Sequence, residues 1–190
     1  CFNDEEAYYV PVAHEYLGVP KQTSEKFAAW AIGQIYKGCV IGQNLKYDFK
    51  VVKRNLGLEP PVNFKDTMIL AWLMDPSSSV GMDALAKRLY DYDTIKFEDV
   101  VKRGETFASV ALENAAKYAA EDAWITLKFY KSFLNLLDPD LLALADTHEF
   151  PFILTLFDME REGIAINQEK MQNLILQNDA KIKALTAEIY

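Results

Sequence analysis

The chain has 190 residues, a formal net charge of −8 and 51% hydrophobic residues, which is enough apolar material for a packed core. Proteins that coat nucleic acid without sequence preference are usually basic, so this composition excludes a passive coat protein and leaves open a metal-dependent nuclease. We see no apolar run of membrane-spanning length and no secretion signal. The two cysteines, Cys1 and Cys39, are too few for a disulfide framework, so we expect a cytoplasmic protein in which Cys39 is a buried, reduced thiol. The two histidines, His14 and His148, are isolated and form no zinc pattern.

Strand and helix patterns alternate in the first part of the chain. In chain order, we predict a strand over Ala7–Val12, a helix from Thr23 or Ser24 to about Lys37, a strand over Cys39–Gly42, a helix over Leu45–Leu56, a brief strand over Phe64–Thr67, and helices over Met68–Met74, Met82–Leu89 and Phe97–Val101. Glycine follows two of the helices, at Gly38 and Gly57, where it is typical of a helix end. This alternation predicts an α/β domain.

The second part of the chain is predicted to be helical. One long or broken helix covers about Ser109 to Leu137, and Asp138-Pro139 ends it. Leu141–Glu162 is again helical, with Pro151 as a boundary or kink. After the extended link 163–166, Asn167 caps a last helix. No strand pattern returns after Pro139, so we place one domain at residues 1–138 and a second at 139–190.

Two short segments carry residues suited to metal chemistry. Asn44 and Asp48 are four residues apart at a strand-to-helix junction, so a helix starting at Asn44 brings both onto one face. The alternative is an N-cap asparagine and a solvated aspartate. Tyr118 and Asp122 are also four apart, in a strong helical pattern, where a hydroxyl beside a carboxylate could orient a metal-held water. The alternative here is a half-buried tyrosine and a surface aspartate.

Read together, these segments resemble the second and third motifs of the DEDD-type 3′–5′ exonucleases, of the subtype with tyrosine, as found in family A DNA polymerases. The segments that carry the resemblance, in the right order, are Tyr9–His14, Ile41–Asp48, Phe64–Met68, Met82–Ala86, Thr94–Glu98 and Tyr118–Asp122. Met159–Ile164 looks like the start of the polymerase domain, with helices leading to the thumb. The resemblance covers nearly the whole chain.

The resemblance implies an RNase-H-like fold and hydrolysis of DNA 3′ ends by two divalent metals, Mg²⁺ or Mn²⁺. It assigns Asp48 and Asp122 as metal carboxylates and Tyr118 as the residue that positions the attacking water. The residues that would contact the single-stranded 3′ end are Gln43, Asn44, Lys46, Tyr47 and Phe97. Phe97 suits base stacking, although a place in the core is an equal alternative, and Lys46 could be an ordinary surface lysine. Primer-template DNA is the implied partner, and we expect a monomer that does not meet a membrane.

The family has a further motif, Asp-x-Glu, on a central strand that precedes the Tyr9 region. Asp4 and Glu6 have this spacing, but they lie where the family has a polar turn, so we interpret them as a decoy. We therefore expect a truncated fold that lacks its central strand and two metal carboxylates. The loop Ser77–Gly81 also lacks a basic residue that some relatives place near DNA.

Three interpretations remain open. The leading one is a proofreading exonuclease domain whose activity belongs to a longer parent enzyme, with little activity in the isolated chain. The second is a catalytically inactive exonuclease-fold scaffold that supports a polymerase domain. The third is a stand-alone exonuclease of the ribonuclease D kind, which the segment after Pro139 argues against.

Overall fold

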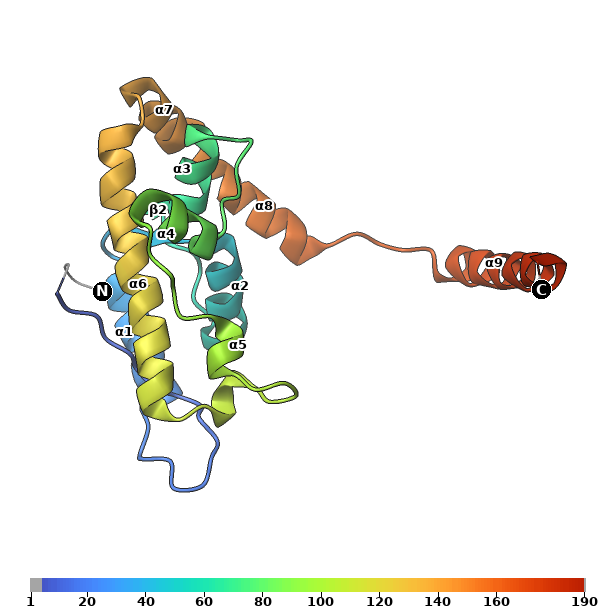
Figure 1. The fold of residues 1–190 in the computed structure, drawn as a ribbon, viewed down its shortest axis with the longest axis horizontal. Helices are drawn as coiled ribbons and strands as arrows, with labels where there is room; N and C mark the ends of the chain where they lie inside the picture. The colour runs from blue at the N-terminus through green and yellow to red at the C-terminus, as the bar shows by residue number, and fades with distance from the viewer. Residues whose placement is uncertain (1–4, 190) are drawn as a thin grey trace. The chain divides into compact units, whose positions relative to one another are not determined.

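The computed structural model describes residues 5–189, and Figure 1 shows its elements. These are α1 (Glu25–Ile35), β1 (Val40–Gly42), α2 (Leu45–Leu56), β2 (Phe64–Asp66), α3 (Thr67–Met74), α4 (Met82–Tyr90), α5 (Phe97–Val100), the 3₁₀ turn η1 (Phe107–Ser109), α6 (Leu112–Leu136), α7 (Pro139–Leu144), the π-helical turn η2 (Ala145–Glu149), α8 (Phe150–Glu162) and α9 (Gln168–Ile189). The chain divides into two compact units, Cys1–Phe157 and Asp158–Tyr190.

A small βαβ unit lies at the centre of the larger unit. Strands β1 and β2 pair in parallel, with Val40 opposite Phe64 and Gly42 opposite Asp66, and α2 makes the connection between them. Parallel strands need such a crossover, usually a helix. These two strands are the whole sheet in the part of the chain that the structure describes. The chain is therefore a mostly helical α/β protein, which confirms the predicted α/β class.

The core forms between α6 and the elements packed along it. Ile125, Phe129 and Phe133, spaced at helical intervals on one face of α6, are fully buried. They join Phe49 of α2 and Leu85 of α4 in one apolar cluster, which α8 also enters. In Figure 1, α6 runs along the length of the larger unit, with α5 near its first turns. The helix thus connects the apolar core to the end of the unit where Tyr118 lies.

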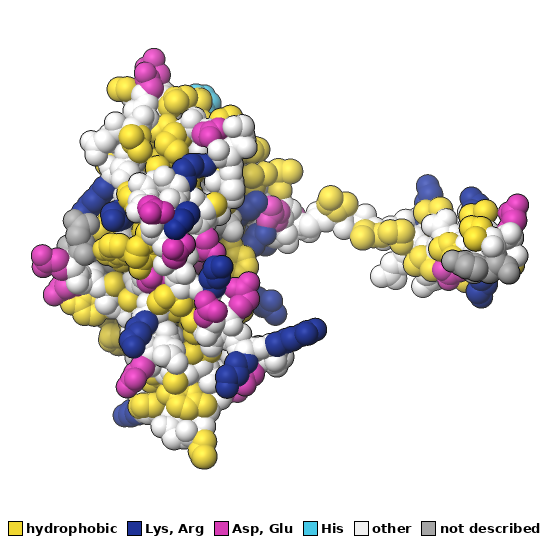
Figure 2. Space-filling view, viewed as in Figure 1, with side chains coloured by type: hydrophobic (Ala, Val, Ile, Leu, Met, Phe, Trp, Pro, Cys, Tyr) yellow, Lys and Arg dark blue, Asp and Glu magenta, His cyan; other side chains and the backbone are white. Residues whose placement is uncertain are grey.

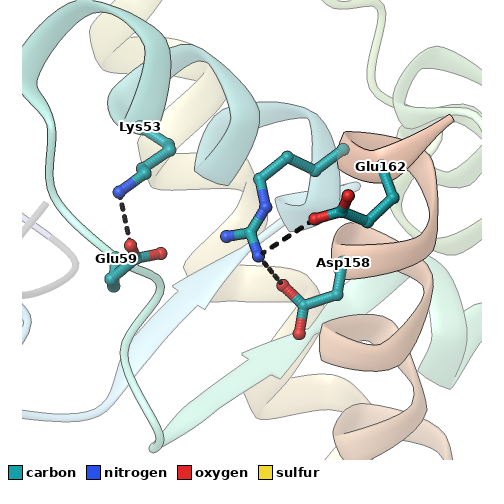
Figure 3. Close-up of polar contacts among 5 residues, drawn as sticks. Lys53, Glu59, Asp158 and Glu162 are labelled. Atoms are coloured by element: carbon teal, nitrogen blue, oxygen red, sulfur yellow. Dashed lines mark hydrogen bonds and ion pairs between the residues drawn. The ribbon is translucent and has the colours of Figure 1, made fainter.

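Helix ends occur where the sequence predicts them. The Ser24 hydroxyl accepts the Phe27 N–H at the start of α1, and the Asn167 side chain accepts the Lys170 N–H at the start of α9. Gly57 ends α2 with a φ of 72°, the left-handed conformation that favours glycine. An ion pair between Lys53 and Glu59 links the last turn of α2 to the segment that follows (Figure 3).

The segment Ala7–Val12 is not a strand, which corrects the prediction made from its Tyr and Val content. Pro11 has no N–H to donate to a ladder, and its carbonyl accepts the Thr23 N–H instead. The side chains of Tyr9 and His14 attach this segment to the turn before α6. Tyr9 therefore packs beside the start of α6, whereas Tyr8 and Val10 are exposed.

One further expectation about a single residue is wrong. Cys39 is exposed, because it lies just before β1, a strand whose described residues pair on one side only, with β2. His14, which stands apart from any zinc pattern in the sequence, is buried and hydrogen-bonded in the fold.

The helical region after Pro139 contains an irregularity near Pro151. The residues just before it, Ala145–Glu149, form the π-helical turn η2. Proline lacks the N–H that would bond four residues back and its ring crowds that carbonyl, so a local change of helix geometry is expected there. The π-helical turn leads directly into α8, whose second residue is Pro151, so Pro151 lies at a change of helix type within one continuous helical stretch.

The smaller unit contains the end of α8, the link and α9. Arg161 lies 3.2 Å from Asp158 and 3.9 Å from Glu162, and both carboxylates are labelled in Figure 3. Every described residue of α9 is exposed. Within residues 5–189, no helix is both long enough and apolar enough to cross a membrane.

Candidate functional site

The junction between β1 and α2 is held by a buried carboxylate, Asp66 at the end of β2. Its side chain, 1% exposed, accepts the N–H groups of Asn44 (3.0 Å) and Leu45 (2.8 Å), and also that of Met68 (2.9 Å). One carboxylate thereby caps the starts of both α2 and α3. Burial raises the pKa of Asp66, while these hydrogen bonds oppose the rise.

Asn44 has the unusual backbone that this junction requires. Its φ of 62° and ψ of 46° are left-handed, a region that asparagine tolerates better than most residues. It stands at the cap position, but its side chain makes no capping hydrogen bond in the described structure, because Asp66 does that work. The side chain is exposed, so it remains available to a ligand.

Asp48 lies one turn further along α2. Burial, then repulsion from Asp66, raises the pKa of Asp48 from 3.8 to about 6. The residue nonetheless has an exposed surface, so a cation could reach a carboxylate whose negative charge the surroundings disfavour. Burial, then the charge of Asp48, raises the pKa of Tyr36 to about 12. A cation beside Asp48 would relieve the cost of this charge.

The neighbouring residues predicted to contact DNA differ in their availability. The amide of Gln43 donates to the Val80 carbonyl at 2.8 Å and accepts the Thr67 hydroxyl, so this side chain ties β1 to two other segments. Tyr47 is 66% exposed, and Lys46 is half-buried. The structure therefore gives Gln43 an internal role that the sequence did not indicate, and leaves Tyr47 on the surface.

Tyr118 and Asp122 meet on α6 as their spacing predicts. Their side chains share a hydrogen bond. Burial raises the pKa of Asp122 from 3.8 to about 6, with Glu121 and Asp83 adding to the rise and the Tyr118 hydroxyl opposing it. Burial, then Asp122, raises the pKa of Tyr118 to about 12, so its hydroxyl keeps its proton at neutral pH.

Two further carboxylates, Glu121 and Asp83, lie near Asp122 and are held in place by hydrogen bonds. The Glu121 carboxylate accepts the Tyr92 hydroxyl at 2.5 Å and the Ile95 N–H at 2.6 Å, which fastens the segment before α5. Asp83 accepts the Thr94 hydroxyl at 2.7 Å. Both carboxylates are thus engaged in structural hydrogen bonds, and both still act electrostatically on Asp122.

Three aromatic rings meet beside Tyr118. Phe97, at the start of α5, lies 6.3 Å from the Tyr118 ring centroid and 6.4 Å from that of Phe107. Phe107 lies 5.9 Å from Tyr118. Phe97 is 50% exposed, so it is not the core residue that the alternative interpretation offered. Its open face suits base stacking.

The donor types fit a divalent cation, but the described residues do not form a complete metal site. Asp48 and Asp122 both carry a charge that their surroundings disfavour, as a cation-binding carboxylate does before its cation arrives. The charged neighbour that affects the pKa of Asp48 is Asp66. The neighbours that affect the pKa of Asp122 are different ones, namely Tyr118, Glu121 and Asp83. Residues 5–189 contain no group of three or more His, Cys, Asp or Glu side chains that could hold a metal.

Comparison with known proteins identifies the family. Residues 2–138 match the family described as 3′–5′ exonuclease. The chain belongs to the 3′–5′ exonuclease family. This exonuclease-family chain is 32% identical over 99% of its length to DNA polymerase I of Borreliella burgdorferi, and 31% identical over 97% to that of Pseudomonas aeruginosa. DNA polymerase I of Treponema pallidum is 41% identical over 71% of the chain.

The chain spans only part of these relatives. The match covers 21% of the Borreliella and Pseudomonas proteins and 14% of the Treponema protein. The resemblance to the exonucleases of family A polymerases is thereby confirmed. The roles of the individual site residues stay predictions.

Sequence reasoning did not find three residues that organise this exonuclease-family site: Asp66, Phe107 and His14. The sequence could have predicted the capping role of Asp66, since an aspartate between a strand and a helix is a common helix cap. Phe107 and His14 had none, because their contacts join segments far apart in the chain. Of the suspected decoy, Asp4 lies outside the described residues, and Glu6 accepts the Tyr8 hydroxyl at 3.3 Å.

Proposed function

We propose that this chain is the proofreading 3′–5′ exonuclease domain of a DNA polymerase of the polymerase I kind. Residues 1–138 would belong to an RNase-H-like domain, and 139–190 would be the first helices of the polymerase domain. One observation carries the proposal. In a member of the exonuclease family, Asp48 and the Tyr118–Asp122 pair stand on two helices of one core, and both carboxylates have pKa values of about 6.

The proposed reaction is hydrolysis of the last phosphodiester bond of a DNA 3′ end. Mg²⁺ or Mn²⁺, held by Asp48 and Asp122, would supply an activated water and charge stabilisation when bound. Tyr118 contributes as a neutral hydroxyl, because its pKa is about 12. A hydroxyl fixed by Asp122 can orient a water molecule without adding a charge.

The DNA would approach over the exposed side chains beside the two carboxylates. Phe97 offers a stacking face, while Asn44, Lys46 and Tyr47 line the start of α2. Gln43 would act on DNA only indirectly, by fixing the loop before Gly81 through Val80. The face of the larger unit shown in Figure 2 mixes acidic, basic and hydrophobic side chains, with no single sign covering it. Binding by localised contacts and metals suits such a surface better than a cationic groove.

The second candidate function is an inactive scaffold with the same fold. Loss of activity in a lineage removes the pressure to keep metal-binding residues in place. Asp48, Tyr118 and Asp122 are all present, and Tyr118 is hydrogen-bonded to Asp122. These features favour an active exonuclease.

The test uses the full-length enzyme and a primer with a mispaired 3′ end in Mg²⁺. Asp48→Ala or Asp122→Ala should slow excision by at least about 100-fold, since a metal ligand contributes several kcal/mol to the transition state. Polymerisation should continue at the wild-type rate. Unchanged excision in both variants would refute the metal assignment, whereas no excision by the wild-type enzyme would favour the scaffold.

Asp4→Asn tests the decoy in the same assay. We expect its excision rate to equal that of the wild type, because Asp4 lies in a segment that the family places in a polar turn. A loss as large as that of Asp48→Ala would instead assign Asp4 and Glu6 to the metal site.

A further inference from the structure

A segment near the start of the chain attaches to the turn that precedes α6. The buried His14 ring receives the Tyr9 hydroxyl at Nε2 (2.5 Å) and, through Nδ1, lies 2.9 Å from the Val110 carbonyl. Since a carbonyl can only accept, Nδ1 carries the proton and Nε2 is the acceptor. The Glu15 N–H donates to the Ala108 carbonyl at 2.7 Å. Segment 9–16 therefore contacts the middle of η1 and the residue that follows it.

The same segment also reaches the helix itself. The Tyr16 hydroxyl accepts the Leu112 N–H at 3.3 Å, in the first turn of α6. The Gln22 side chain fixes His14 in turn, accepting its N–H and donating to its carbonyl, both at 2.7 Å. The position of η1 and the start of α6 are thus set by residues nearly 100 positions earlier in the chain.

Phe107, the first residue of η1, connects this attachment to the aromatic rings of the site. Its ring centroid lies 5.9 Å from that of His14 and 5.9 Å from that of Tyr118. It also stacks on Phe97 at 6.4 Å with planes 15° apart. Phe107 is half-buried, and it is the one ring of these three that contacts His14 among the described residues.

The Phe97 and Tyr118 rings have few large apolar neighbours besides Phe107. Phe97 begins α5, a helix of four residues with no buried member. Tyr118 is half-buried. A small apolar cluster of Val101, Val110 and Ala115 lies in this region, and Ala115 is the residue that α6 contributes to its buried set. Edge and stacked ring contacts fix relative ring orientation, so Phe107 restricts both rings together.

We propose that Phe107, held in place by His14, is a positioning residue that orients the Tyr118 and Phe97 rings for binding and cleavage of the DNA 3′ end. This inference rests on the proposed exonuclease function. It assigns a role to two residues outside the set proposed to bind metal or DNA.

A double-mutant comparison in the full-length enzyme tests the role of Phe107. Single-turnover excision from single-stranded DNA in Mg²⁺ is measured for Phe107→Leu in the wild-type background and in a background that carries both Tyr118→Ala and Phe97→Ala. We expect a loss of about 10-fold in the first, because misplacement by a fraction of an ångström already costs rate, and less than about 2-fold in the second. Phe107→Tyr, which keeps the ring, should stay within about 2-fold of the wild type.

A purely structural role predicts a different result. If Phe107→Leu only loosened the fold, it would slow excision equally in both backgrounds, and that outcome would overturn the proposal. Phe152→Leu, the same substitution at an exposed position on α8, is the matched control and should leave excision unchanged. Thermal unfolding of each variant shows whether the excision assay compares folded proteins.

The His14 part is tested in the same way. Tyr9→Phe removes one hydrogen bond, and His14→Ala removes both hydrogen bonds of the His14 ring and its contact with Phe107, so we expect losses of about 2-fold and about 5-fold respectively. In the Phe107→Leu background His14→Ala should add almost nothing; an equal loss there would overturn the link.

Asp122→Ala separates the two levels of inference. If Asp122→Ala leaves excision unchanged, the proposed function fails. If Asp122→Ala slows excision but the effect of Phe107→Leu is equal in both backgrounds, only the positioning role is refuted.

Discussion

At the scale of single residues, the site depends on carboxylates with opposite tasks. Asp66 is buried and satisfied by backbone N–H groups, so its charge is used to hold two helix starts. Asp48 and Asp122 have charges that their surroundings disfavour, and so they are the ones suited to a cation. Sequence alone presents all three simply as aspartates, because burial and hydrogen-bond partners distinguish them.

Asp66→Asn should destabilise the domain strongly. An amide offers one acceptor and turns an N–H₂ group toward backbone donors, so buried N–H groups are left unpaired at a cost of about 2–4 kcal/mol. Urea unfolding of the isolated chain measures the change. Asp179→Asn on the exposed α9 is the control and should not move the midpoint. A midpoint shared by both variants would show that Asp66 is not the cap we describe.

The pKa values of Asp48 and Asp122 predict a pH dependence of stability. Both are raised from 3.8 to about 6 in the fold, so the protonated form is the favoured one there. Their contribution to stability is complete below about pH 4 and is lost as the pH rises through about 6. Thermal unfolding in EDTA should therefore show this loss between pH 4 and pH 6, and Asp48→Asn with Asp122→Asn should flatten it.

At the scale of elements, local signals fixed most of the helix ends. Ser24, Gly57 and Asn167 act within one turn of their own position, so the sequence predicts them well. The Ala7–Val12 segment shows the limit of such reasoning. Its strand-like composition is overridden by Pro11 and by the contacts of Tyr9 and His14 with a turn distant in sequence.

Two glycines on neighbouring helices should respond to alanine in opposite directions. Gly57 ends α2 at a φ of 72°, so Gly57→Ala should cost about 1 kcal/mol, although no atom lies near the added methyl group. Gly33 lies inside α1 with equally open space, and Gly33→Ala should stabilise by about 0.5–1 kcal/mol. Urea midpoints of the two variants check the pair. Equal signs would show that backbone conformation is not the deciding factor.

At the scale of the whole molecule, the two units differ in how they are stabilised. The larger unit has the apolar cluster around α6, whereas α9 in the smaller unit buries none of its described residues. A helix without a buried face contributes little to cooperative unfolding. The stability of the chain should therefore reside in the larger unit.

Truncation after Glu162 tests this distribution. A chain that ends there keeps all of α8 but lacks the link and α9, and we expect the same unfolding midpoint as the complete chain, with only a smaller helical signal by circular dichroism. A clear drop in the midpoint would show that α9 is stabilised by contacts with the rest of the chain.

The sequence by itself determined the α/β class, most helix limits and the family, because these depend on local patterns and on short motifs that keep their spacing. It also placed Asp48, Tyr118 and Asp122 on helices, where the structure has them, whereas the helix expected to start at Asn44 begins only at Leu45, after the left-handed Asn44. Only the tertiary structure decided what surrounds them: the capping role of Asp66, the internal hydrogen bonds of Gln43, the exposure of Cys39, and the attachment of Phe107 to His14. These depend on contacts between segments distant in sequence, and no local pattern encodes such contacts.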